Sequence, residues 1–349
     1  MKKLFSRPRF ISLLILSVLL LNACLPSYGA VAQVPLNATV PVTKAAQHAA
    51  NKPTLLPPTV TPTLLPTATV SPTPSPIAKR VLILSIDGLR PDAIDLAPMP
   101  NLKALMQIGA YSLTAQTIFP SSTLPSHASM LTGLCPVQHG VDWNDYIPER
   151  GFAKGVDLFD LAHAAGLKTV MFVGKEKLKQ ITEPESVDVF RYINDRDVVL
   201  VERLTEEFPT DFGLLFIHFA TPDAMGHVYG WLSPEYISVV QRADEALGTI
   251  LKDLDERGLR QDTLVIVTAD HGGHDQTHGS RQAEDMTIPW VISGPGVRPG
   301  PLSSPIQTTD TAATAAWALN LPRPADWDGW PVFEAFGRIL QLRPKPFCD

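Results

Sequence analysis

Apolar runs alternate with amphipathic segments along most of the chain. Continuous runs rich in Val, Ile and Leu predict buried strands at Val81–Ile86, Thr169–Val173, Gly213–His218, Leu264–Thr268 and Trp290–Ser293. Helical spacing of apolar residues predicts helices at Met99–Ile108, Leu158–Ala165, Val198–Glu207, Pro234–Glu256 and Thr309–Leu319. Since strands alternate with helices throughout, the pattern predicts one α/β domain over residues 79–349 with a mostly parallel sheet.

The N-terminus has the pattern of an export signal. Four basic residues precede an apolar run from Phe10 to Leu21, which is short for a membrane-spanning helix. Leu21-Asn22-Ala23-Cys24 then resembles the bacterial lipobox, in which the cysteine is lipidated and becomes the mature N-terminus. We expect residues 1–24 to be a signal peptide with a lipobox; the alternative is an ordinary secretory signal cut near Ala30 or Ala32. Both predict export, and the first predicts a membrane anchor at Cys24.

Residues 25–78 resemble a tether. From Pro53 to Pro76 the chain has eight Pro and seven Thr and no charged residue. Such a segment cannot form a core and favours extended polyproline-II geometry. We therefore expect a disordered, Pro/Thr-rich tether between the anchor and the domain.

Charge and cysteine content narrow the function further. From residue 79 onward there are 23 basic and 35 acidic residues, a formal net charge of −12, which argues against a nucleic-acid-binding face. If Cys24 is acylated, Cys135 and Cys348 remain. In an oxidising compartment they could pair, and two free buried thiols are the alternative.

The richest chemical motif is the stretch Asp270–His278, which follows a predicted buried strand. Five of its nine residues are Asp or His, the side chains that bind zinc, iron or manganese. Ligands past the end of a strand lie where open α/β sheets keep their active sites. Asp270 and His271 are the adjacent ligand candidates, and His278 can reach a different ion. His274 and Asp275 are expected to support the ligands or to be solvated.

Three further motifs follow predicted strands or begin predicted helices. Asp87 ends the first strand, although Asp-Gly is also a common turn. Thr123 lies near the start of a helix that Pro125 favours, where a hydroxyl faces free N–H groups and a phosphate can bind; alternatively it only caps the helix. Asp223 and His227 share one face if their segment is helical, and the alternative is a loop.

Taken together, the motifs indicate one shared site. Six ligand candidates divide into two sets of three, and a catalytic metal with three protein ligands keeps an open position. Two such ions about 4 Å apart can clamp the attacking and leaving oxygens of an in-line displacement at phosphorus.

The order of these motifs resembles the alkaline phosphatase superfamily, in particular its type I phosphodiesterase/nucleotide pyrophosphatase branch. The resemblance covers roughly residues 79–336, and it also rests on His139-Gly140 and on Thr309–Thr314 through Asp328-Gly329. It implies a three-layer α/β/α fold. It also implies that a small phosphodiester or nucleotide is the substrate.

The resemblance also implies roles for the site residues. Asp87, Thr123, Asp270 and His271 would bind one zinc ion, and Asp223, His227 and His278 the other, with Mn²⁺ or Fe as possible substitutes. Thr123 would be the nucleophile that forms a covalent phospho-threonine adduct. Asn144 would steady a non-bridging phosphate oxygen. His127 and His139 are expected to be structural or to support the ligands.

Differences between this sequence and the motifs of related enzymes narrow the class of substrate. The segment Thr123–His127 lacks the convertible Cys or Ser and the Arg of sulfatases, so sulfate esters are not expected. No Lys or Arg is expected beside Thr123 to bind a dianion, which favours diesters over monoesters. Trp143, Tyr146, Tyr229 and Trp231 are candidates to stack on the organic half of the substrate, and ordinary packing is the alternative.

Three functions compete at this stage. The first is an exported, membrane-tethered two-zinc phosphodiesterase. The second is a phosphonate hydrolase or phosphomonoesterase on the same site. The third is a metal-stabilised surface lipoprotein that binds a phosphorylated partner without turnover, which would not need Thr123.

Overall fold

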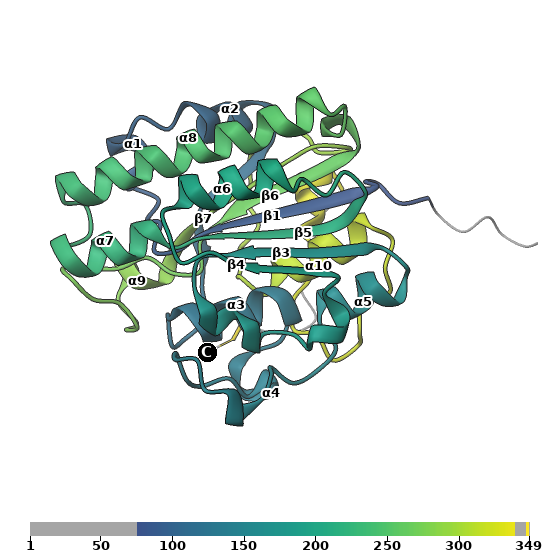
Figure 1. Ribbon diagram of the computed structural model, residues 1–349, viewed down its shortest axis with the longest axis horizontal. Helices are drawn as coiled ribbons and strands as arrows, with labels where there is room; N and C mark the ends of the chain where they lie inside the picture. The colour runs from purple at the N-terminus through teal and green to yellow at the C-terminus, as the bar shows by residue number, and fades with distance from the viewer. Residues whose placement is uncertain (1–74, 339–346, 349) are drawn as a thin grey trace, which may run out of the picture. The chain divides into compact units, whose positions relative to one another are not determined.

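The computed structural model describes residues 75–338 and 347–348, and one eight-stranded sheet runs through the described part (Figure 1). Its strand order is β4-β3-β5-β1-β6-β7-β2-β8. The strands are β1 Arg80–Ile86, β2 Ala110–Gln116, β3 Lys168–Val173, β4 Val189–Tyr192, β5 Phe212–Phe219, β6 Thr263–Thr268, β7 Thr287–Ser293 and β8 Gly300–Pro301. The predicted signal peptide with Cys24 and nearly all of the predicted tether lie outside the described residues.

The sheet is mostly parallel, as predicted. The pairs β3–β4, β3–β5, β1–β5 and β1–β6 are all parallel, and β7 runs antiparallel to its neighbours β6 and β2. Every residue of β5 and β6 is buried, as is all of β1 except Arg80. A strand that helices cover on both faces has a continuous run of apolar residues. These strands were therefore predictable from the sequence.

Helices cover both faces of the sheet and complete the three-layer arrangement (Figure 1). In the orientation of Figure 1, α2, α6 and α8 lie above the sheet and α3 and α5 below it. Helix α10 packs against α3 and α5. The helices are α1 Ala93–Leu96, α2 Pro100–Ile108, α3 Thr123–Thr132, α4 Pro136–His139, α5 Leu158–Ala164, α6 Asp197–Glu206, α7 Thr221–Tyr229, α8 Pro234–Glu256, α9 Ala283–Met286 and α10 Asp310–Ala318. Within the described residues, no helix is long and apolar enough to span a membrane.

The predicted elements match the observed ones closely, and the omissions have a physical cause. All five predicted strands and all five predicted helices are present within a few residues of their expected bounds. The prediction omitted β2, β4 and β8. The segment Ala110–Gln116 alternates buried and partly exposed positions, and Val189–Tyr192 has no fully buried residue, so neither forms the apolar run on which the prediction relied.

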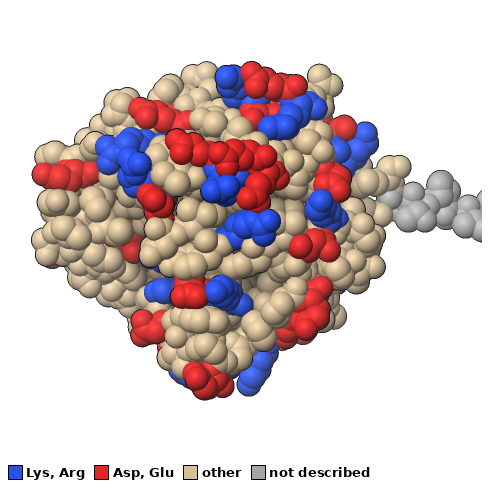
Figure 2. Space-filling model, in the orientation of Figure 1, with Lys and Arg blue, Asp and Glu red and all other residues tan. Residues whose placement is uncertain are grey.

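Acidic and basic side chains are interspersed over the face that Figure 2 shows. The exposed ion pairs of the described residues include Arg203 with Glu206 on α6 and Lys252 with Glu256 on α8. Exposed pairs of this kind contribute little to stability, roughly 0–1 kcal/mol each. The chemically informative charges are instead buried at one edge of the sheet.

Candidate metal-dependent active site

The candidate ligands converge where four adjacent parallel strands end. In the order β3-β5-β1-β6, these central strands share one carboxyl edge. Asp87 follows β1, and Asp270 and His271 follow β6. After β5 the chain continues into α7, which carries Asp223 and His227. The site therefore lies at the edge where open α/β sheets bind their ligands.

The first group of candidate ligands consists of Asp87, Asp270 and His271. All three side chains are fully buried. The His271 Nε2 atom lies 3.4 Å from Asp87 Oδ1 and 3.4 Å from Asp270 Oδ2. These ligand atoms lie within 4.8 Å of one another, so a single ion can contact all three.

The second group consists of Asp223, His227 and His278. The segment that carries Asp223 and His227 is helical, so the loop alternative is wrong and the two side chains share one face of α7. The Nε2 atoms of His227 and His278 each lie 3.5 Å from Asp223 Oδ1. The rings of His271 and His278 stack at 3.8 Å between centroids, which places the second group directly beside the first.

The three histidines all present the same ring nitrogen to their group. Each Nδ1 lies within hydrogen-bond distance of a backbone carbonyl: His271 of Gly272 at 2.7 Å, His278 of Ser121 at 2.9 Å and His227 of Gln276 at 3.0 Å. A carbonyl oxygen can only accept, so Nδ1 carries the proton of the neutral ring. The lone pair of Nε2 is then left free for a metal ion.

Four buried atoms of the two groups have no hydrogen-bond partner among the described residues. They are Asp87 Oδ1, Asp223 Oδ1, Asp270 Oδ2 and His271 Nε2. Leaving such atoms unsatisfied in a protein interior is costly unless another group pairs with them. All four are atoms that can bind a metal ion, so the donor set fits bound metal ions.

The turn after β1 requires its glycine. Gly88 has φ +73°, and a Cβ there would lie 3.2 Å from Asp223 Cα, so a larger residue would be strained and crowded. Its N–H donates to Asp270 Oδ1 at 3.1 Å, which helps to orient that carboxylate. The Asp87-Gly88 dipeptide is therefore a turn that also orients Asp270 within the first group.

Thr123 is the first residue of α3 and lies beside Asp87 of the first group. Its side chain is buried, with 1% of the residue exposed, and its Oγ1 lies 3.4 Å from Asp87 Oδ2. The side chain of Asn144 lies alongside, where its Oδ1 accepts the Leu124 N–H at 2.9 Å. The structure thus brings Thr123, Asn144 and all six predicted ligands into one site.

The expectation that no basic side chain lies beside Thr123 is wrong. The Lys175 Nζ donates to Thr123 Oγ1 at 3.1 Å and lies 2.7 Å from Asp87 Oδ2 and 2.5 Å from Asp223 Oδ2. Lys175 follows β3 by two residues and so ends at the same sheet edge as the ligands. The rule that identified Asp87, a polar side chain just past a buried strand, would have identified Lys175 too.

Burial and close charges shift the pKa values of this site in opposite directions. Burial acts to raise the pKa of Asp87, but Lys175 and the hydrogen bond from His218 outweigh it and hold that pKa well below its usual range. Burial, together with the nearby Asp87 charge, raises the pKa of Asp270 to about 7. Two carboxylates this close favour sharing a proton or a cation.

Two buried histidines that were not predicted ligands support the site. His218 Nε2 donates to Asp87 Oδ2 at 2.9 Å, and the Gly174 N–H is shared between His218 Nδ1 and its carbonyl at 3.3 and 3.2 Å. His127 bonds two groups: its Nδ1 lies 2.7 Å from the Thr123 carbonyl oxygen, and its Nε2 lies 2.8 Å from the Ser85 hydroxyl. His127 was expected to have a supporting position, whereas His218 was read only as the end of a strand.

The remaining candidates lie around the site. His139 lies away from the ligands, and its Nε2 bonds the Ser129 hydroxyl at 2.9 Å. His274 Nδ1 pairs with Asp285 Oδ1 at 2.7 Å. Asp275 is exposed. Trp231 is buried and donates to the Gly88 carbonyl at 2.8 Å, so the packing alternative holds for this ring.

The two cysteines left by the sequence analysis form a disulfide, Cys135–Cys348. This resolves the alternatives in favour of pairing. Cys135 and Cys348 also belong to a group with Asp328 that could bind a metal ion, but their sulfur atoms are consumed by the bond. A further acidic group, Asp157 with Asp160 and Glu183, contains the reciprocal cap at the start of α5.

Comparisons with known proteins identify a family and several relatives. The profile of the family described as type I phosphodiesterase / nucleotide pyrophosphatase matches residues 81–286. Human ectonucleotide pyrophosphatase/phosphodiesterase family member 5 is 27% identical over 224 residues, which cover 56% of this chain and 45% of the human protein. The catalytic subunit of human GPI ethanolamine phosphate transferase 2 is 30% identical over 292 residues, covering 77% of this chain and 29% of that protein. The chain therefore spans less than half the length of these curated relatives.

The fold is also found in a solved structure of a mutant of alkaline phosphatase PafA. That structure is 13% identical, has a TM-score of 0.63 and covers 75% of this chain and 99% of its own. At this identity the likeness establishes the α/β fold alone.

Proposed function

The chain belongs to the type I phosphodiesterase/nucleotide pyrophosphatase family, and from this premise we propose that it is an exported two-zinc hydrolase that cleaves phosphodiester bonds. The observation that carries the proposal is the convergence of the two ligand groups on Thr123. The buried Thr123 Oγ1 lies 3.4 Å from Asp87 Oδ2, and Lys175 Nζ contacts Thr123, Asp87 and Asp223, which links this hydroxyl to both groups. A protein that only bound a phosphorylated partner would not need this hydroxyl there.

The two groups would bind one zinc ion each. Asp87, Asp270 and His271 would hold the first, together with Thr123, and Asp223, His227 and His278 the second. Imidazole and carboxylate are ligands that zinc accepts in open catalytic sites. When bound, the two ions would lower the pKa of the Thr123 hydroxyl and offset the negative charge of a phosphodiester.

Thr123 would act as the nucleophile. Its oxygen forms a bond to phosphorus while the bond from phosphorus to the leaving oxygen breaks, which leaves a covalent ester on Thr123. Water then cleaves that ester and releases the product with Thr123 restored. Since the Leu124 N–H already holds Asn144 Oδ1, the Nδ2 end of the amide remains to donate to a non-bridging oxygen.

The position of Lys175 favours a second activity, the hydrolysis of phosphomonoesters. A monoester dianion carries one more negative charge than a diester, and the Lys175 ammonium 3.1 Å from Thr123 Oγ1 can pair with it. We therefore retain monoesters as the second candidate substrate class. If this is correct, Lys175→Ala lowers turnover of monoesters more than turnover of diesters.

One substrate panel tests the proposal. Nitrophenyl phosphodiester, nucleotide diester, phosphomonoester, phosphonate and sulfate substrates are assayed with the metal-free chain and again after addition of zinc, manganese or iron. We expect zinc-dependent turnover that is highest for a diester, and little turnover of the sulfate. No turnover of any substrate with any metal would reject the hydrolase and favour the binding protein.

Export and anchoring are a separate part of the proposal. The disulfide is of a kind that persists in oxidising compartments, which supports an extracytoplasmic location. In the native host, Cys24→Ser should move the protein from the membrane fraction to the soluble exported fraction. Unchanged membrane retention of Cys24→Ser would contradict the lipid anchor while leaving export open.

A further inference from the structure

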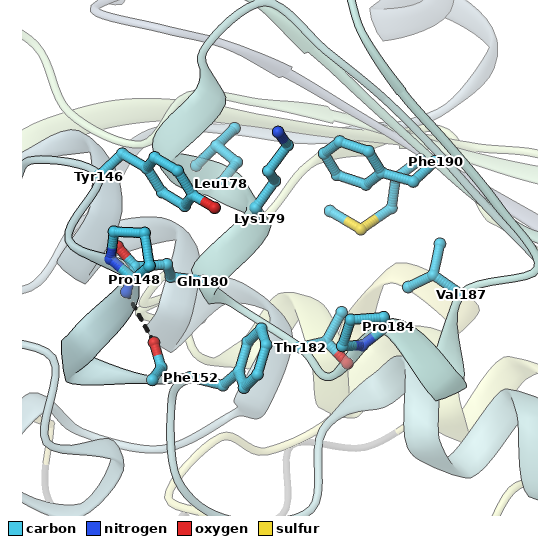
Figure 3. A pocket seen from close by; sticks show the side chains of 12 residues that line it. Tyr146, Pro148, Phe152, Leu178, Lys179, Gln180, Thr182, Pro184, Val187 and Phe190 are labelled. Atoms are coloured by element: carbon cyan, nitrogen blue, oxygen red, sulfur yellow. Dashed lines mark hydrogen bonds between the residues drawn. The ribbon is translucent and has the colours of Figure 1, made fainter.

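Two features outside the ligand groups have no place in the proposed mechanism. One is a pocket of about 340 Å³ that rings and aliphatic side chains line, among them Tyr146 and Phe152 (Figure 3). None of its lining residues is a candidate ligand. The other is a hydrogen-bonded pair, His274 with Asp285, in the segment that carries His278. This pair, unlike the pocket, is linked to candidate ligands by a short run of hydrogen bonds.

Asp285 holds both ends of a short segment with its two carboxylate oxygens. It belongs to α9, and its side chain is fully buried. Its Oδ1 accepts the Nδ1–H of His274 at 2.7 Å, and its Oδ2 accepts the N–H of Ser280 at 2.8 Å. Because both oxygens accept, the group is bound as a carboxylate, and such hydrogen bonds are stronger than those between neutral groups. Residues 274–280 are therefore held firmly against α9.

The held segment begins with a tight turn over residues 274–277. The N–H of His274 donates to the Thr277 carbonyl, and the N–H of Thr277 donates to the His274 carbonyl, both at 2.9 Å. Asp275, the second residue of the turn, has φ +46°, in the left-handed region that Asp tolerates better than most residues. His278 follows the turn directly, so the direction of its side chain depends on how the turn is held.

The same turn contacts the other histidine of the second ligand group. The Gln276 carbonyl accepts the Nδ1–H of His227 at 3.0 Å. The Asp275 carbonyl accepts the N–H of Trp231 at 2.8 Å, just after the end of α7. The turn is thus joined to His227 by a hydrogen bond and to His278 by the chain itself.

His274 is not itself a candidate ligand. It belongs to neither ligand group, and its Nε2 lies 3.0 Å from the Gln282 amide nitrogen. Its side chain is 19% exposed and is bonded at both ring nitrogens. Of the two roles that the sequence left open for His274, these contacts favour support of the ligands over solvation.

Building on the proposed function, we propose that His274 and Asp285 are positioning residues for the second metal ion. The pair holds the turn, and the turn orients the rings of His227 and His278 toward Asp223. Neither member of the pair touches the ion or the phosphate. Loss of the bond between them therefore lowers the affinity of the second ligand group for its ion and spares the first group.

Two substitutions of His274 separate the Nδ1–H bond from the rest of the ring. The amide nitrogen of Asn takes about the place of Nδ1, whereas that of Gln takes about the place of Nε2. Zinc affinities of the full chain are measured by competition with a chromophoric chelator. We expect His274→Gln to weaken the binding of one zinc ion by about tenfold or more and to leave the other unchanged. His274→Asn keeps a donor for Asp285 and should keep most of the affinity.

A double substitution shows which ion responds. His278→Ala already impairs the second group, so adding His274→Gln to it should not weaken the remaining ion further. Asp285→Asn has one oxygen for two donors and should weaken the same ion as His274→Gln, so it decides the question if that chain does not fold. His163→Gln makes the same chemical change at a side chain that is 47% exposed and should bind both ions normally.

The possible results separate this assignment from the proposed function. Equal affinities of the His274→Gln and His274→Asn chains, or an equal loss at both ions, would show that the pair does not position the second group. Fewer than two zinc ions on the unsubstituted chain would reject the metal site and this role with it. A chain that binds two ions but turns over no substrate would reject the hydrolase alone, because the zinc affinities are measured without substrate.

Discussion

At the scale of single residues, the tautomers of three histidines say most about the site. His271 and His278 lie in one stretch after β6 and His227 on α7, yet each uses Nδ1 for a backbone carbonyl and turns Nε2 toward an Asp carboxylate. His127, which is not a candidate ligand, also bonds a carbonyl through Nδ1, but its Nε2 faces the Ser85 hydroxyl. A common orientation is expected when every ring must offer a lone pair to an ion.

His218 is predicted to position Asp87 for metal binding. By donating to Oδ2 it leaves Oδ1 as the free oxygen of that carboxylate. We expect His218→Phe to weaken zinc binding at one of the two sites by about 10–100-fold, the usual effect of losing such a partner. Competition with a chromophoric chelator measures the two affinities.

Two control variants distinguish a specific effect of His218 on zinc affinity from a general loss of folding. His218→Gln keeps a donor and should recover most of the affinity. His163→Phe alters a histidine whose side chain is 47% exposed and should bind both ions normally. Equal affinities of the His218→Phe and His163→Phe chains for both ions would show that His218 does not position Asp87.

The sequence predicted the ligands well because their chemistry and position coincide. Asp87, Asp270 and His271 each follow an apolar run, and Asp223 and His227 have helical spacing. Lys175 was missed because it lies 52 residues from Thr123 along the chain, and only the pairing of β3 with β5 brings it to the same sheet edge. His218 was missed because it lies within a strand, and only the pairing of β5 with β1 brings it to Asp87.

At the scale of elements, central strands and long helices were predictable and edge strands were not. A strand such as β6 is buried on both faces, so its sequence is continuously apolar. The edge strands β4 and β8 are short and only partly covered, and they carry no such signal. Register and strand order were likewise not predictable, because they depend on contacts between distant segments.

Asp157 at the start of α5 is predicted to make stability depend on pH. Burial and the Asp160 charge raise the pKa of Asp157 to about 7, whereas an exposed Asp has a pKa of about 3.9. The folded chain therefore holds this proton more tightly than the unfolded chain. The resulting stabilisation is complete below pH 4 and is lost as the pH rises to about 7.

Asp157→Asn should remove this contribution to the pH dependence. The Asn oxygen can still accept the Asp160 N–H, which now bonds Asp157 Oδ1 at 2.9 Å, so the helix cap is kept. Urea unfolding at pH 5 and pH 8 measures the effect, which is on the order of 1 kcal/mol per pH unit. If both chains lose the same stability between these pH values, Asp157 is not the titrating group.

At the scale of the whole molecule, the disulfide ties the end of the chain to the folded part. Cys348 lies 213 residues after Cys135, and its backbone is also held by Gln307 at 2.8 and 3.2 Å. Closing a loop of this length stabilises the folded state by about 5 kcal/mol in the chain-entropy model. We expect reductant to lower the Tm by several degrees, measured by calorimetry.

The matched control for this prediction is the chain with Cys135→Ser and Cys348→Ser. Its Tm should be close to that of the reduced chain and should not change with reductant. A chain whose Tm is the same with and without reductant, although its thiols are shown to be free, would mean that the bond contributes nothing to stability. The sequence alone left this pairing open, because spacing does not determine which cysteines meet.

The central claim is that Thr123 attacks phosphorus between two bound ions. The most direct test compares kcat/KM for a nitrophenyl phosphodiester between the zinc-loaded chain and its Thr123→Ala variant, with the zinc content of both measured. We predict that Thr123→Ala retains two zinc ions per chain and loses activity by about a thousandfold or more, as expected for removal of a nucleophile. Full activity of the zinc-loaded Thr123→Ala chain would contradict the account.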